Sequence, residues 1–282
     1  MYFRPSISWT EILKRTVAEI GADHCLGLAA QLAFYFFLAL FPALLFLVAL
    51  IGYLPVENAI SALLEALGTV APGEALDLLK GQLNELSSGR HGGLLTLGIV
   101  GAIWSSSAAM VAIIDALNHA YDVDEWRSWL KRRVLAIGLT IALALFILAS
   151  LALVLLGPSI VGWAADRFGV APAVEFAWRV ARWPVIAALV VFGVDLVYYF
   201  APNRKARWAW VTPGSLLATC LWVASSFGFK FYVSQFGNYN ATHGAIGGVI
   251  VLLLWFYVSA FAILIGAEMN GVIEQSERAK EG

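Results

Sequence analysis

The fold of this chain follows from a stretch near its end, Phe236-Gly-Asn-Tyr-Asn-Ala-Thr-His-Gly-Ala-Ile-Gly-Gly248. This polar, glycine-rich segment leads into a run of about 20 mostly apolar residues, which is long enough to cross the hydrocarbon of a bilayer as a helix. The run ends at Gly266-Ala-Glu-Met-Asn270, where a carboxylate stands at the boundary with water. The stretch therefore predicts a membrane-spanning helix with polar residues gathered at both ends.

The composition of the whole chain agrees with a membrane protein. Of its 282 residues, 61% are hydrophobic and 13% are charged, and the mean hydropathy is +0.80. Soluble domains are about 45–50% apolar and about 25% charged, so one water-soluble core cannot hide this much apolar surface. Alternating segments of about ten residues, which a membrane barrel requires, are not visible. We expect an all-α, polytopic membrane protein.

Six stretches are apolar over the roughly 20 residues that a crossing needs. Each is expected to be a helix, because backbone groups in lipid must be satisfied within the segment. With the N-terminus inside, basic residues concentrate in the inner segments, and the positive-inside rule predicts that both termini are cytoplasmic. We expect one integral domain over residues 1–282 in the bacterial inner membrane, with spans at residues 26–54, 93–114, 134–156, 183–201, 211–233 and 246–267.

Two regions outside the spans have amphipathic patterns. Ser8 and Glu11 fit a capping box, and the helix that follows, with apolar residues at helical spacing, is expected to lie on the inner membrane surface. The long outer loop, residues 55–92, carries two apolar stripes that predict two short amphipathic helices between spans one and two. These helices either cap the bundle or dock a periplasmic protein partner, and the sequence leaves both open.

Polar residues within or beside the spans are the candidates for function, because ionisable groups there are costly and usually face a bundle interior or a water-filled cavity. The predicted topology places six of them on the cytoplasmic side, where they could line one polar cavity. The alternative is that the polar residues at the edges of the spans are ordinary interfacial residues without a functional role. The six candidates are Gln31, Asp115, Asn118, Asp195, Glu268 and Asn270.

Two further residues stand apart from this set. Lys230 lies toward the outside within span five, where it either snorkels to the interface or contacts an anionic headgroup or substrate. Pro42 is expected to kink span one by removing a backbone hydrogen bond. The alternative is that Pro42 serves only helix packing and has no role in gating.

Enzymatic chemistry has little support in the sequence. The four histidines are scattered over both sides of the membrane and show no metal-ligand spacing, and no serine sits in a nucleophile elbow. Cys25 and Cys220 form no pair motif. The basic runs are short and explained by topology, whereas nucleic-acid binding needs a basic groove with aromatics. We expect no enzyme activity, metal, cofactor or nucleic-acid partner.

Four motifs resemble those of the YihY/virulence factor BrkB family. They are Asp115-Ala-Leu-Asn-His-Ala-Tyr-Asp122, Tyr198-Tyr-Phe-Ala-Pro-Asn-Arg204, Gly237-Asn-Tyr-Asn-Ala-Thr-His-Gly244 and Gly266-Ala-Glu-Met-Asn270. The resemblance covers nearly the whole chain and implies a six-helix bacterial inner-membrane protein. Some members carry an inherited ribonuclease label, which this sequence does not support. The family brings no established catalytic residues.

Two functional hypotheses follow. The first is transport or export of an anionic or amphipathic envelope molecule, with a lipid as one option. In that hypothesis Asp195 and Glu268 act as coupling or gating groups, and Lys230 is an outer anion contact. The second hypothesis is a scaffold without transport activity that docks periplasmic partners through residues 55–92.

Overall fold

The computed structural model describes residues 7–51, 95–168, 171–205, 208–236 and 245–281, together with a few residues between 64 and 81. Every regular element in these ranges is a helix, as expected from the composition. The elements are α1 (Trp9–Ala22), α2 (Cys25–Ile51), α5 (Leu95–Ala120), α6 (Trp129–Phe168), α7 (Ala171–Phe200), α8 (Pro213–Phe236) and α10 (Ala245–Glu281).

The first two helices are joined by a sharp hinge. Ser8 is the N-cap of α1, and its side chain accepts a hydrogen bond from the backbone N–H of Glu11, as the capping box predicts. The side chain of Glu11 binds Arg15 instead of completing the box. At residues 23–24 the chain turns by 66° into α2, with His24 at a φ of 51°, in the left-handed region that non-glycine residues visit rarely.

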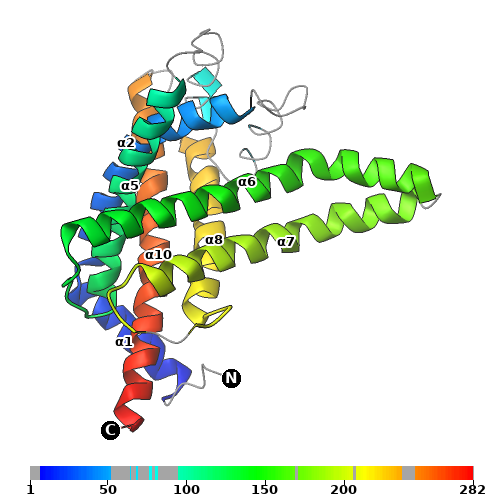
Figure 1. The fold of residues 1–282 in the computed structure, drawn as a ribbon. Coiled ribbons are helices and arrows are strands. Elements are labelled where there is room, and N and C mark those ends of the chain that lie inside the picture. Colours follow the sequence, from blue (N-terminus) through cyan, green and yellow to red (C-terminus); the bar gives the residue numbers. More distant parts are fainter. Residues whose placement is uncertain are drawn as a thin grey trace.

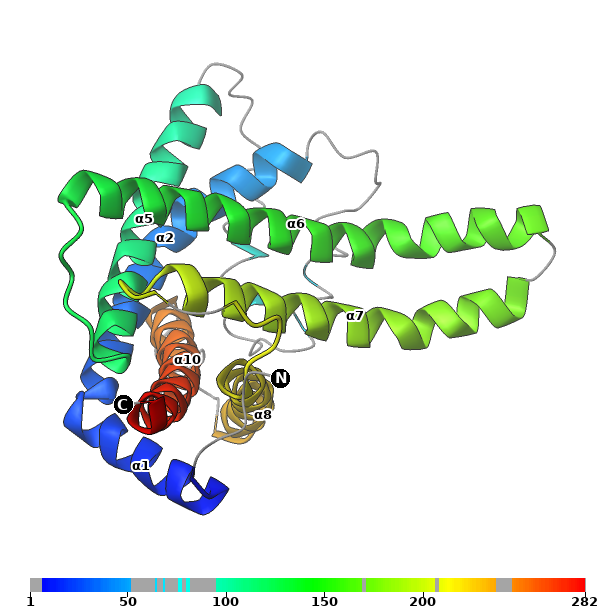
Figure 2. The same ribbon diagram turned by 60° about the horizontal axis from the view of Figure 1, so that its bottom comes forward.

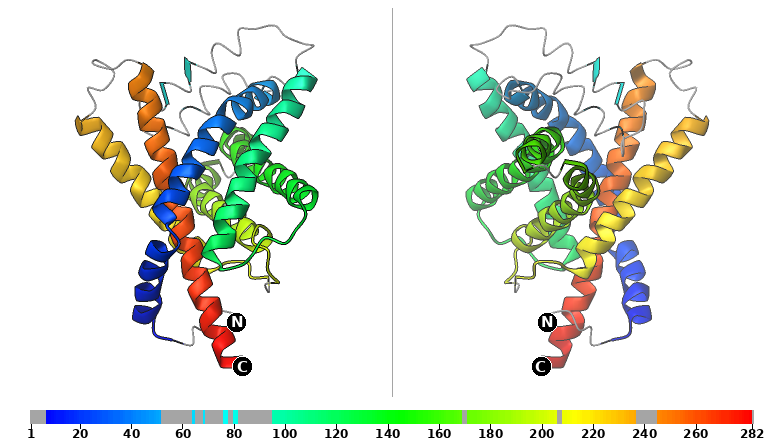
Figure 3. Two further views of the ribbon diagram at one scale, coloured as in Figure 1. Left: turned by 90° about the vertical axis from the view of Figure 1, so that its left-hand side faces the viewer. Right: turned by 90° about the vertical axis from the view of Figure 1, so that its right-hand side faces the viewer.

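Helices α2, α5, α8 and α10 run alongside one another, and the start of α1 and the end of α10 lie near one end of this group (Figures 1 and 3). We call that end the terminal end. Helix α10 is the central element, because it packs against α8, α2, α1 and α5. Helices α6 and α7 form a long hairpin that runs across the others and projects beyond them (Figures 1 and 2).

The lengths of several helices differ from the expected spans. Four described helices contain segments long and apolar enough to cross a membrane, and α1 with the first part of α2 gives a fifth if the bent pair counts as one span. Helix α6 has 40 residues and α10 has 37, which correspond to about 60 and 55 Å. Both exceed the hydrocarbon thickness of about 30 Å. Hydropathy marks the apolar part of such a helix, whereas the helix itself continues through polar residues at its ends.

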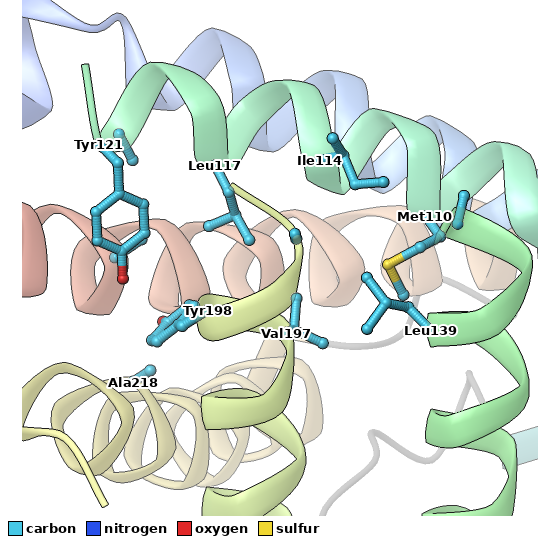
Figure 4. Packing of buried hydrophobic residues seen from close by; sticks show 12 residues of the cluster. Met110, Ile114, Leu117, Tyr121, Leu139, Val197, Tyr198 and Ala218 are labelled. Atoms are coloured by element: carbon cyan, nitrogen blue, oxygen red, sulfur yellow. The ribbon is translucent and has the colours of Figure 1, made fainter. Parts of the chain in front are cut away.

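The main core lies where α5, α6, α7 and α8 meet. Figure 4 shows Leu117 of α5 and Tyr121, which directly follows α5, pointing toward Tyr198 of α7, with Ala218 of α8 beside them. A second core packs Cys25, Ala29 and Leu32 of α2 against α5 and α10. These cores lie toward the terminal end, where the helices converge, and they hold together the polar groups described next.

Candidate functional site: a polar cluster at the terminal end

Asp195 is buried on α7 and reaches the start of α8. Its carboxylate accepts hydrogen bonds from the hydroxyls of Thr212, at 2.6 Å, and Ser215, at 2.8 Å. The backbone N–H of Thr212 is a third donor, at 3.4 Å. The positive end of the α8 dipole also favours a carboxylate at this place. Asp195 is thus satisfied by one helix terminus and does not face an open cavity.

Asn270 of α10 joins the same network. Its side-chain amide donates to the Thr212 hydroxyl at 2.9 Å, and its side-chain oxygen accepts from the backbone N–H of Gly214 at 2.9 Å. The structure therefore brings together two of the six predicted cavity residues, Asp195 and Asn270. It does so through Thr212, which ties α7, α8 and α10 into one unit.

The network sits beside a close crossing of α8 and α10. A β-carbon at Gly214 would overlap the backbone carbonyl of Gly266, and one at Gly266 would overlap the carbonyl of Gly214, the Tyr198 hydroxyl and Ala218. Small residues allow helix backbones to approach this closely in membranes. The two glycines therefore set the distance at which Asn270 reaches α8.

Glu268 faces a different direction from Asn270. It is 2% exposed, and its carboxylate accepts a hydrogen bond from the thiol of Cys25 at 3.0 Å. Burial raises the pKa of Asp23 at the hinge, the charge of Asp122 adds to the rise, and a hydrogen bond with Glu268 opposes it. The buried Glu268 carboxylate and the Asp23 carboxyl group therefore both lie beside the α1–α2 hinge.

Asn118 joins two loops at the terminal end. Its side-chain oxygen accepts from the backbone N–H of Asn203, and its amide donates to Glu125 at 3.0 Å. Arg127 binds the same Glu125 and the carbonyl of Ala201. Burial alone would raise the pKa of Glu125, but hydrogen bonds from Arg127 and Asn118 outweigh it and lower the pKa. This arrangement locks the turn after α7 onto the turn after α5.

Asp115 is partly exposed and forms an ion pair with Arg132 in the first turn of α6, with 2.6 Å between the two atoms. The basic residue that topology placed near the cytoplasm therefore has a specific carboxylate partner. Asp115 belongs to the wall of the terminal end and contacts neither Asp195 nor Glu268 in the described hydrogen bonds and ion pairs.

Arg204 is the buried cation of the region. Its guanidinium lies 3.9 Å from the centre of the Tyr121 ring, pairs with Glu274 of α10, and donates to the carbonyl of Tyr198. The Tyr198 hydroxyl donates to the carbonyl of Ile263 at 2.5 Å. We refer to residues 115–127, 195–204, 212–215 and 268–274 together as the motif cluster, since three of the four motifs quoted above meet in it.

An open pocket lies on the surface of the motif cluster next to the hinge. Its volume is about 440 Å³. Five of the lining residues have carboxylates, and the basic residue among them is His119. The lining residues are Asp23, Asp115, Asn118, His119, Asp122, Val123, Asp124 and Glu125.

Three predicted residues lie outside the motif cluster. Gln31 is exposed on α2, and of the six predicted cavity residues only Asp115 and Asn118 line the pocket. Pro42 lies within α2, which continues past it to Ile51. Lys230 of α8 donates to the backbone carbonyl of Gly68 at 2.5 Å, so this ammonium ties α8 to the segment between α2 and α5. Most of residues 55–92, and the motif at 237–244, lie outside the described residues.

Sequence reasoning missed several residues of the motif cluster. Thr212 and Ser215 are common helix-capping types just before and within the start of a span, and this signal could have been read. Cys25 forms no pair motif, and the sequence did not indicate its hydrogen bond to Glu268. Arg204 and Glu274 carried no signal, because a pair of charges 70 residues apart cannot be seen without the fold.

The long apolar helices and the polar groups at one end define a multi-pass helical membrane protein. Residues 16–282 match the sequence profile of the virulence factor BrkB family, and the chain belongs to that family. A protein of Bacillus subtilis (strain 168) described as "Putative ribonuclease-like protein YfkH" is 40% identical over 250 residues, which cover 89% of this chain and 90% of the relative.

Other relatives are described as UPF0761 membrane proteins. One from Tolumonas auensis is 27% identical, with 63% of this chain and 57% of the relative covered. One from Ralstonia nicotianae is 28% identical, with 90% and 56% covered. The chain thus spans a little more than half the length of these two relatives. No solved structure matches the chain.

Proposed function

We propose that this chain moves an amphipathic envelope molecule, such as a lipid or a lipid-linked compound, across the bacterial inner membrane. The observation that carries the proposal is Glu268, a carboxyl group buried on a spanning helix. None of the ion pairs among the described residues includes it, and the hydrogen bond that it accepts there comes from the Cys25 thiol. Ionisable groups inside spans commonly mark substrate or proton pathways.

The proposal assigns Asp195 and Glu268 different roles. Asp195 has three donors and the end of a helix to hold its charge, so its burial is explained by the α7–α8 connection. Glu268 has no comparable set of partners and lies next to the hinge and its pocket. We therefore place gating or proton coupling at Glu268 and assign Asp195 a positioning role.

The charge of the pocket favours one class of substrate. Two of its five carboxylates already pair with arginines. The other three, those of Asp23, Asp122 and Asp124, would repel a free anion at the terminal end, but they can accept an amine-bearing headgroup. The ammonium group of Lys230 already donates a hydrogen bond to the Gly68 carbonyl, so we do not assign it a contact with an outer anion. An amphipathic molecule with a cationic or zwitterionic headgroup fits these features better than an anionic one does.

The test is lipid movement in vesicles that contain the purified protein. Fluorescent phosphatidylethanolamine and phosphatidylglycerol are placed in both leaflets, and dithionite reports the probe that reaches the outside, with and without a pH gradient. We expect faster exposure of phosphatidylethanolamine with the wild type and a loss of that rate with Glu268→Gln. Glu11→Gln on the exposed face of α1 is the matched control. Equal rates with the protein and with empty vesicles would refute the proposal.

The description of the Bacillus subtilis relative as ribonuclease-like does not lead us to propose the same activity here. Arg127, Arg132 and Arg204 each pair with a carboxylate, so they do not form a free basic surface for RNA. We propose that the chain is not a nuclease. Degradation of a labelled RNA that follows the purified protein through every column, and is lost in a variant of this chain, would contradict this.

A further inference from the structure

Helix α1 has two apolar faces, and the structure accounts for one of them. Ile12 and Thr16 are buried, and Ile12 packs against Met269, Val272 and Ile273 of α10. The second face contains Trp9, Leu13 and Val17, which are 50%, 51% and 69% exposed. The spacing of the apolar residues predicted a single apolar face directed toward the membrane surface. The structure instead separates the buried set from the exposed set.

The geometry of the hinge indicates what can cover the second face. Helix α1 has 14 residues, so it is about 21 Å long. It makes an angle of 66° with α2, and therefore rises by about 9 Å along the direction of α2. Amphipathic helices at a membrane surface bury their apolar face by about 5–10 Å. If α2 follows the membrane normal, the whole of α1 lies within that layer.

The neighbouring side chains have the order expected at a membrane surface. Successive residues of a helix are about 100° apart, so Lys14 follows the exposed face on the side away from α10. Lys14 is exposed and can reach lipid phosphates. On α2, beyond the hinge, Leu26, Phe34 and Leu38 are also exposed, so apolar side chains remain uncovered on both sides of the hinge. Lipid can cover both, because a bilayer surface extends past the hinge.

We propose that Trp9, Leu13 and Val17 insert into the leaflet at the terminal end, so that α1 is a strap between lipid and α10. Its buried face holds α10 at Met269, Val272 and Ile273, directly beside Glu268 and Asn270. A change in the depth or angle of α1 is therefore transmitted to the part of α10 that bears these two residues. This inference concerns membrane contact and does not require that the chain transports anything.

Site-directed spin labelling tests the strap. Cys220 is exposed and Cys25 is fully buried, so the Cys220→Ser background should take up no label, which mass spectrometry checks. Val17→Cys and Ala18→Cys form a matched pair, because both positions are exposed on α1 and point about 100° apart. Each labelled protein is placed in phosphatidylglycerol vesicles, and collisions with oxygen and with a water-soluble nickel chelate are measured.

We expect the label at Val17 to collide mainly with oxygen and the label at Ala18 mainly with the nickel chelate, which gives a several-fold difference in the ratio. High nickel accessibility at both positions would mean that α1 stands in water and would overturn the inference. Low accessibility to both reagents at Val17 would mean that a protein surface covers the face, and would overturn it as well. Loss of lipid transport in the earlier assay would leave this measurement unaffected.

Discussion

Replacing Asp195 by asparagine separates a positioning role from a role in transport. The variant keeps the size of the side chain, but it turns one acceptor oxygen into an NH₂ group and removes the charge. In the wild type the two oxygens accept from Thr212 at 2.6 Å and from Ser215 at 2.8 Å. Ser215 already lies 2.9 Å from the Thr212 carbonyl and can turn fully to it. One charged hydrogen bond is then lost.

The cost can be estimated from these contacts. A hydrogen bond to a charged group contributes about 1.5–3 kcal/mol, and a carboxylate at a helix N-terminus contributes about 0.3–2 kcal/mol. The two contributions together predict that Asp195→Asn lowers the free energy of unfolding by about 2–5 kcal/mol. Asp195→Ala should cost more, because the Thr212 and Ser215 hydroxyls would then both lack this acceptor.

The assay is unfolding in mixed micelles with increasing SDS, followed by circular dichroism and tryptophan fluorescence. Asp124→Asn is the matched control, because Asp124 is exposed and its backbone carbonyl, which accepts from Asn203, is unchanged. The control should unfold with the wild type. If Asp195→Asn also unfolds with the wild type and yet abolishes lipid movement, then Asp195 acts in transport and the positioning role is wrong.

Three other changes give distinct outcomes in the same unfolding assay. Gly266→Ala should lower stability by at least about 1–3 kcal/mol, because its methyl group meets the Gly214 carbonyl, whereas Gly228→Ala, which meets no neighbour, should not. Glu125→Gln should destabilise the protein at neutral pH. The pKa of Glu125 is lowered in the fold, so this difference should shrink as the pH falls through that pKa, and a constant difference would contradict the assignment. Asp23→Asn should be more stable than the wild type at neutral pH, because burial raises the pKa of Asp23 and the folded protein loses stability as the pH rises above about 4. That advantage should vanish in acid, and a variant less stable at every pH would show that the charge of Asp23 is needed.

The fate of the six predicted cavity residues shows how far sequence reasoning reaches. The sequence gives each residue's distance along the chain from the end of an apolar run, and this distance predicts its depth. The direction of each side chain was not predictable. Asp195 and Asn270 share Thr212, Glu268 turns to Cys25, and Gln31 faces outward. Successive side chains of a helix point about 100° apart, so neighbouring residues contact different partners. The rotation of the whole helix about its axis depends on how it packs against the other helices.

The class of this protein was therefore decided by the sequence alone. An apolar run of about 20 residues can satisfy its backbone in lipid only as a helix, whatever its neighbours are. The pairing of its polar groups was decided by the tertiary structure. Arg132 meets Asp115 across 17 residues, Asn270 meets Thr212 across 58, and Arg204 meets Glu274 across 70. The contact of Asn270 with Thr212 depends on two glycines that let α8 and α10 cross closely. The other two contacts depend on how α5, α6, α7 and α10 pack, and none of this geometry is encoded in hydropathy.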